Sequence, residues 1–143
     1  MVATRFAVAL HILLFITFGS EEEATSARMA LSIGTNPVVV RRIAGQLARA
    51  GLITVQRGPG GASLARPAES ITLEEVWRAI HPARERLIRV HATANAADKV
   101  GRIAPEVIRS RLDAAEAALL RDLAATSIAD LAQRMMPERR RAS

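Results

Sequence analysis

The pattern of apolar and polar residues predicts helices in the first third of the chain. Residues 6–18 are almost all apolar, which is typical of a helix that is buried on more than one side. Thr25 can cap the next helix, over residues 27–33, and Gly34 supplies the left-handed turn with which helices commonly end. The acidic residues 21–23 between the two helices are interpreted as a solvated turn.

A third helix and a β-hairpin are predicted next. Asn36 can cap the helix, with Pro37 at its first position, where no N–H is needed. Residues 52–55 and 63–65 have a strand-forming composition and flank a turn rich in glycine and proline. Two helices joined by a tight turn and followed by a hairpin predict a winged helix-turn-helix, whose second helix enters the major groove of DNA. The positions of the third helix that should face the core are Val40, Ile43, Ala44 and Leu47.

The outer face of this third helix and the turn of the hairpin supply the candidate DNA contacts. Arginine binds phosphates and the edges of bases, and valine can contact the methyl group of thymine. An arginine at the tip of the hairpin can reach a neighbouring groove or phosphate. The candidate DNA-binding residues are Thr35, Asn36, Val38, Val39, Arg41, Arg42, Arg57 and Gly58.

The second half of the chain predicts a long amphipathic helix. Thr72 and Glu75 form a capping-box pair that opens a short helix through Ile80. After a loop around residues 94–101, a helix over residues 105–125 carries an apolar stripe. Because the stripe lies outside a small winged domain, we expect self-association, and the alternative is packing on its own winged domain. The expected dimerisation residues are Val107, Ile108, Leu112, Ala115, Leu119 and Leu123.

Together these elements predict a mainly α-helical fold with a small β-hairpin, namely a winged helix-turn-helix domain plus a long C-terminal dimerisation helix. The DNA-binding domain is expected over residues 1–82 and a helical linker and dimerisation region over residues 83–136. The second region includes a last short helix, residues 128–136. Residues 137–143 are interpreted as a flexible basic tail.

Composition narrows the function. The net charge of +6 and the pI of about 11.4 favour a polyanionic partner such as double-stranded DNA. The chain has no cysteine, so thiolate ligation of an iron–sulfur cluster and thiol-based sensing are excluded. Its three histidines are scattered, and no nucleophile–base arrangement is visible. We therefore predict neither an enzyme nor a metal or other cofactor.

The N-terminus allows a second interpretation. Arg5 followed by the apolar residues 6–18 also resembles the start of a signal peptide. The run is too short to cross a membrane, and His11 interrupts it. We interpret it as the buried first helix, which predicts a cytoplasmic protein without a membrane partner.

Four segments, in this order, resemble the Rrf2 family of winged-helix transcription regulators: residues 36–43, 50–53, 57–61 and 71–80. The resemblance implies a dimeric DNA-binding regulator, most often a repressor, that reads a pseudo-palindromic operator. Family members that bind an iron–sulfur cluster carry about three cysteines in the segment corresponding to residues 91–103, where this chain has none. We therefore do not expect this chain to sense signals through an iron–sulfur cluster.

Two questions stay open at this stage. Control of DNA binding is expected from an unknown small-molecule effector or a partner acting near residues 77–104, or else from the abundance of the protein alone. The alternative function is a winged helix that serves as a protein-interaction module without specific DNA binding.

Overall fold

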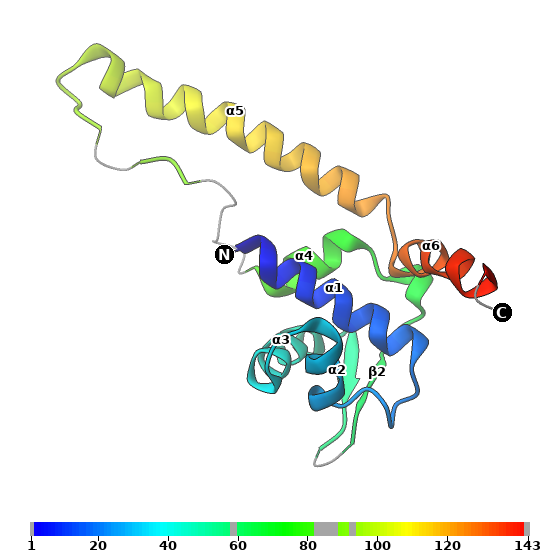
Figure 1. Cartoon of the computed structure of the whole chain (residues 1–143). Helices are drawn as coiled ribbons and strands as arrows, with labels where there is room; N and C mark the ends of the chain where they lie inside the picture. The colour runs from blue at the N-terminus through cyan, green and yellow to red at the C-terminus, as the bar shows by residue number, and fades with distance from the viewer. Residues whose placement is uncertain (1, 58–59, 82–88, 92–93, 142–143) are drawn as a thin grey trace.

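The computed structural model describes residues 2–57, 60–81, 89–91 and 94–141 and shows a small helical domain with a two-stranded antiparallel hairpin, beside a long helix that lies across one end (Figure 1). The predicted fold class is confirmed. The elements are α1 (Val2–Phe18), α2 (Ser26–Ile33), α3 (Pro37–Arg49), β1 (Ile53–Val55), β2 (Ala62–Leu64), the 3-10 turn η1 (Ala68–Ser70), α4 (Leu73–Ile80), α5 (Lys99–Ala124) and α6 (Ile128–Arg141).

The ends of α2 and α3 are set by local signals, as predicted. The Thr25 side chain accepts a hydrogen bond from the backbone N–H of Arg28, and Gly34 ends α2 in the left-handed conformation with φ of 81°. Asn36 caps α3 through its side-chain oxygen, which accepts a hydrogen bond from the Val39 N–H at 3.1 Å. The turn between the two helices therefore needs glycine, because side chains rarely tolerate that φ.

The core is formed by apolar side chains from α1, α3, the hairpin and α4. α1 contributes Ala9, Ile12, Leu13 and Ile16, and the four predicted core positions of α3 are all buried. Each large apolar side chain that is fully buried contributes about 1.5–3 kcal/mol relative to an exposed one. Trp77 packs edge-on against Phe6 with ring centroids 5.0 Å apart.

The start of α6 packs in this core, within the stretch of residues 83–136 that was expected to form a helical linker and dimerisation region. Ile128 is fully buried. The backbone N–H of Leu73 donates to the carbonyl of Thr126 at 2.9 Å, and that of Ile128 donates to the carbonyl of Ile71 at 2.9 Å. These backbone pairs fix the start of α6 beside the start of α4. The expected domain boundary at residues 82 and 83 lies outside the described residues.

Two helix boundaries also differ from the prediction. α5 begins at Lys99, so Pro105 lies inside the helix rather than near its start. Asp98 caps it by accepting a hydrogen bond from the Gly101 N–H at 2.9 Å, which satisfies one of the free N–H groups at the start of the helix. α6 continues through Pro137 to Arg141, so most of the expected flexible tail is helical backbone.

The long helix α5 is the least buried part of the molecule. Among the described residues of α5, none is fully buried. Its C-terminal end packs beside α4, and the rest projects past the domain on the side away from the hairpin tip (Figure 1). Within the described part of the chain, no helix is both long and apolar enough to cross a membrane.

Candidate DNA-binding interface

The first turn of α3 separates residues that position the helix from residues that are presented to solvent. The Thr35 N–H donates to the carbonyl of Ala30 at 3.0 Å, and the Asn36 side chain is used as the N-cap. Val38 is 57% exposed, whereas Val39 is half-buried and packs against the core. Of the two candidate valines, Val38 is therefore the one available to a base.

The outer face of α3 is positively charged. Arg41 and Arg42 are both exposed, and Arg41 makes a long hydrogen bond of 3.4 Å to the hydroxyl of Ser26 at the start of α2. Residues 25–50 contain four arginines and no acidic residue. Among the described residues, neither arginine of this pair forms an ion pair, so their charge is available to phosphate.

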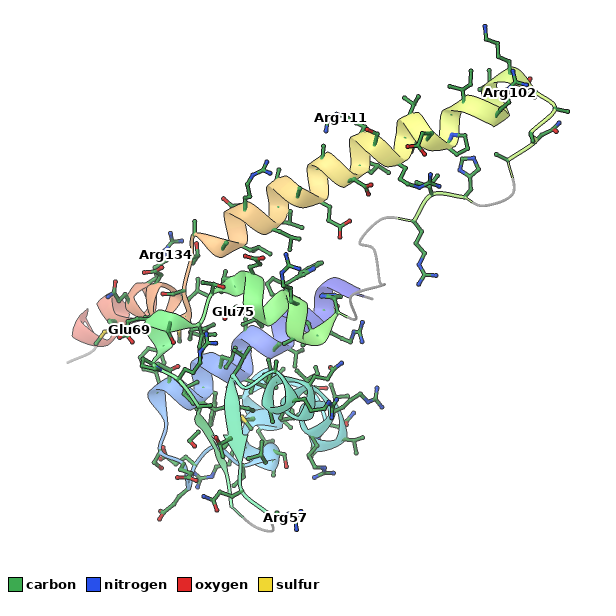
Figure 2. All side chains as sticks on the ribbon, turned by 180° about the vertical axis from the view of Figure 1, so that it is seen from behind. Arg57, Glu69, Glu75, Arg102, Arg111 and Arg134 are labelled. Atoms are coloured by element: carbon green, nitrogen blue, oxygen red, sulfur yellow. The ribbon has the colours of Figure 1, made fainter. Side chains whose placement is uncertain are left out.

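The hairpin carries the other two candidate DNA contacts, Arg57 and Gly58. Its two strands pair in antiparallel register, with Ile53 opposite Leu64 and Val55 opposite Ala62. Arg57 is exposed at the far end of the hairpin (Figure 2). The candidate Gly58 lies outside the described residues.

Contacts with the turn after α1 hold the hairpin in place. The Ala62 N–H donates to the carbonyl of Ala24 at 3.0 Å, and the Gln56 amide donates to the Glu21 carboxylate at 2.6 Å. A Cβ atom at Gly61 would overlap the carbonyl oxygen of Glu21, so only glycine permits this close approach. The position of Arg57 relative to α3 is thus set by the turn over residues 20–24.

The acidic turn over residues 21–23 has a structural role beyond the solvated one that its charge predicts. Glu21 holds the hairpin, and the Glu23 carboxylate accepts a hydrogen bond from the Ser20 N–H at 3.0 Å. That backbone hydrogen bond lowers the pKa of Glu23, because it stabilises the charged form. Glu21 and Gln56 are 35 residues apart, and no local pattern pairs them.

A second polar cluster fixes the base of the hairpin. The Arg66 guanidinium, just after β2, donates to the Glu75 carboxylate at 2.7 Å and to the Ser70 carbonyl at 2.6 Å. Glu75 also completes the predicted capping box with Thr72. The hydrogen bond from Arg66 lowers the pKa of Glu75, and the backbone N–H of Thr72 adds to the effect. The predicted cap is confirmed, and its link to Arg66 is new.

The predicted dimerisation residues occupy different environments. Val107 is 62% exposed, Ile108 is 39% exposed and Ala115 is also exposed. Leu112 and Leu119 are half-buried. Leu123 packs against the core of its own domain. The N-terminal part of the stripe is therefore uncovered within one chain, as a dimer interface requires. The last position of the stripe, Leu123, is already packed within its own chain.

Known proteins resemble this chain along almost its whole length. The family model Rrf2, described as an iron-dependent transcriptional regulator, matches residues 2–134. A Bacillus subtilis (strain 168) protein provisionally named HTH-type transcriptional regulator YwnA is 36% identical over 131 residues, which cover 92% of this chain and 96% of that protein.

Solved structures agree. A crystal structure described provisionally as a DNA-binding protein is 32% identical, has a TM-score of 0.71 and aligns over 89% of this chain and 97% of its own. A Lactobacillus plantarum protein described provisionally as a transcriptional regulator has a TM-score of 0.77 over 97% of this chain and 98% of its own; at 18% identity it supports the fold alone.

The named relatives are regulators of transcription rather than enzymes. The iron dependence in the family description does not extend to thiolate ligation here, since the sequence has no cysteine. The match over residues 2–134 and the winged helix-turn-helix seen in the structure lead to one conclusion: the chain belongs to the Rrf2 family of transcriptional regulators, in a form without the cysteines that bind an iron–sulfur cluster.

Proposed function

We propose that the protein is a dimeric repressor that binds a pseudo-palindromic operator, with α3 in the major groove and the hairpin on the neighbouring minor groove or phosphates. The observation that carries the proposal is the exposure of Arg41 and Arg42 on α3 and of Arg57 at the hairpin tip, none of which has an acidic partner among the described residues. Figure 2 shows Arg57 at the end of the molecule opposite α5.

The residues of this face have separate roles in the proposal. Thr35 and Asn36 position α3, and their backbone and cap hydrogen bonds support that role. Val38 is exposed enough to contact a thymine methyl group, and Arg42 projects from the same helix toward the base edges. Arg41 lies beside Ser26, where helix-turn-helix proteins approach the DNA backbone.

Dimerisation through α5 supplies the symmetry. The exposed apolar positions Val107 and Ile108 lie on a helix that projects past its own domain. A second copy related by a two-fold axis would cover them and would place two α3 helices on successive half-sites, about 34–36 Å apart or a multiple of that distance.

Selection of bound duplexes from a random pool, followed by anisotropy titration, tests the proposal. We expect a two-fold symmetric sequence and an affinity that falls steeply as salt increases, because several arginines per subunit displace counterions. A matched duplex with about 5 extra base pairs between the half-sites should bind far more weakly, since half a helical turn then separates the second site from its subunit. Equal affinity for all duplexes would overturn the proposal and favour a protein-interaction module.

A further inference from the structure

α1 carries a second apolar face that its own domain covers only in part. Ala9, Ile12, Leu13 and Ile16 face the core, yet apolar residues also occupy the opposite side of the helix. A helix that is apolar all round is normally covered on all sides. In this structure the second face forms one wall of a groove of about 1000 Å³ between α1, α2 and α6. Its apolar lining consists of Leu10, Leu14, Phe15, Phe18, Leu131 and Met135.

Polar groups gather on the α2 side of this groove. His11 and Ser32 lie within hydrogen-bond distance, with 2.9 Å between the imidazole Nε2 and the hydroxyl. The Arg28 side chain also lines the groove. Among the described residues it forms no hydrogen bond or close ion pair, and the Glu23 carboxylate attracts it at longer range. Glu23 lines the groove as well, but its carboxylate accepts the Ser20 N–H.

We propose that this groove binds a small amphipathic acid, with its single anionic group on Arg28 and its apolar part along α1. A guanidinium recognises a carboxylate with charge-assisted hydrogen bonds, and ligand pockets are mostly apolar with a few polar groups that orient the ligand. The negative charge of Glu23 at the same end limits the site to one anionic group, because a second would be repelled. The volume accommodates a molecule of drug size.

The position of the groove connects occupancy to DNA binding, and this step rests on the proposed function. Arg28 and Ser32 lie on α2, the helix that packs against α3 through the buried Met29 and Ala30. A ligand that bridges α1, α2 and α6 fixes the tilt of α2 on α1. Because α3 packs on α2, a change in the tilt of α2 also moves α3. If the ligand binds more tightly at one tilt of α2 than at another, the operator affinity changes by the same factor when the ligand binds. The site differs from the expected one near residues 77–104.

Displacement of a fluorescent probe tests the site without DNA. The probe is anilinonaphthalene sulfonate, an aromatic monoanion, with decanoate, decanol and decanedioate as competitors and the full chain as receptor. We expect decanoate to displace the probe at about one-tenth of the decanol concentration, because a charged hydrogen bond contributes about 1.4 kcal/mol or more. Decanedioate should compete less well than decanoate.

Three variants assign the result to the groove. Arg28→Gln should remove the advantage of decanoate over decanol and leave decanol unchanged, whereas Arg42→Gln on α3 should change neither. Leu14→Trp, which fills the groove, should weaken both competitors, and circular dichroism will check that it folds. Equal displacement by decanoate and decanol in the wild type would overturn recognition of the anion. Absence of probe binding would overturn the site.

A DNA arm separates this inference from the proposed function. Decanoate should change the affinity for the selected duplex in the wild type but not in Arg28→Gln. Decanoate-specific displacement in a protein that binds no duplex specifically would overturn the regulatory step and the proposed function, while the ligand site itself would be supported.

Discussion

The hairpin end of the molecule and the long helix α5 are built in opposite ways. The hairpin is short, yet it is held by backbone and side-chain hydrogen bonds to the turn at residues 20–24 and by Arg66 at its base. α5 is the longest helix described, and no side chain of its described residues is fully buried. The comparison shows that the length of an element does not determine how well it is covered. The hairpin is held by partners within the chain, whereas much of α5 is exposed, and we propose that a second copy of the chain covers it.

The largest effect should come from charge placed in the uncovered stripe of α5. Val107→Glu costs little in a single chain, because the side chain is 62% exposed. In a dimer it buries an unpaired carboxylate, which costs about 3–5 kcal/mol. We expect light scattering to show monomers at concentrations where the wild type is dimeric.

Ala117→Glu is the matched control for this variant, because Ala117 is exposed on the side of the helix away from the stripe. It should leave the dimer intact. A wild-type protein that is monomeric at micromolar concentration would refute the role of α5 directly.

The close approach at Gly61 provides the next test. Gly61→Ala places a methyl group against the Glu21 carbonyl, so the hairpin has to move away from the turn. We expect a loss of about 1–3 kcal/mol in the free energy of unfolding, as for other overpacked sites, together with weaker operator binding. Urea denaturation measures the first effect and anisotropy the second.

Gly45→Ala serves as the comparison variant. It adds the same methyl group inside α3, where the nearest atom is the Arg49 guanidinium at an ordinary 3.5 Å. Removing a glycine from a helix should raise stability by about 0.5–1 kcal/mol. Equal effects of the two substitutions would show that the hairpin is not anchored at Gly61.

The arginines of the proposed DNA-binding interface can be separated by their effect on sequence preference. Arg42→Ala should cost about 1–3 kcal/mol and relax the preference at one operator position, as expected for a base contact. Arg57→Ala should weaken all duplexes alike if it binds phosphate, and should relax one position if it reads the minor groove. Anisotropy against single-position operator variants distinguishes these results.

Arg78→Ala is the control, because that arginine is on α4 and pairs with Glu74 at 2.8 Å. It should leave DNA affinity unchanged. An unchanged affinity in Arg57→Ala would instead remove the hairpin from the interface.

The smallest expected effect is a pH-dependent change in the free energy of unfolding, and it comes from the Arg66–Glu75 pair at the base of the hairpin. Because the folded state lowers the pKa of Glu75, its contribution to stability is complete above the unfolded pKa and is lost as the pH falls through the lower folded value. Both side chains of the Arg66–Glu75 pair are more than one-third exposed, so the contribution is at most about 1 kcal/mol.

Glu75→Gln preserves an acceptor for the capping box and removes the charge. Its stability should be lower than that of the wild type at pH 7, and the difference should disappear in acid, once the pH lies below the lowered pKa of Glu75 in the folded protein. Urea denaturation of the wild type and the variant, at pH 7 and at the acid pH, measures this difference. A difference that stays constant with pH would mean that the ion pair does not contribute and that the amide distorts the cap.

The features predicted correctly are those whose causes are local in sequence. The caps at Thr25, Asn36 and Thr72 each act within three residues, so the sequence alone indicates where α2, α3 and α4 begin. Pro105 predicts a later start for α5, because proline favours the first turn of a helix, but the cap at Asp98 starts the helix earlier.

What could not be predicted depends on contacts between distant segments. The Glu21–Gln56 hydrogen bond and the burial of Ile128 follow from how the helices pack, and neither leaves a periodic pattern in the chain. Within the candidate site, the exposure of Val38 and the packing of its neighbour Val39 are also decided by tertiary structure.

The backbone pairs between the starts of α4 and α6 give the fold a modular character. The chain returns at Thr126 to the place where α4 begins: the Leu73 N–H donates to the Thr126 carbonyl, and the Ile128 N–H donates to the Ile71 carbonyl. α4 itself stays in the core, whereas much of α5 projects past the domain. A longer α5 can therefore keep this junction in place, and a longer connection costs little extra closure entropy. A change in the length of α5 thus offers evolution a way to alter the distance between two recognition helices without redesigning either one.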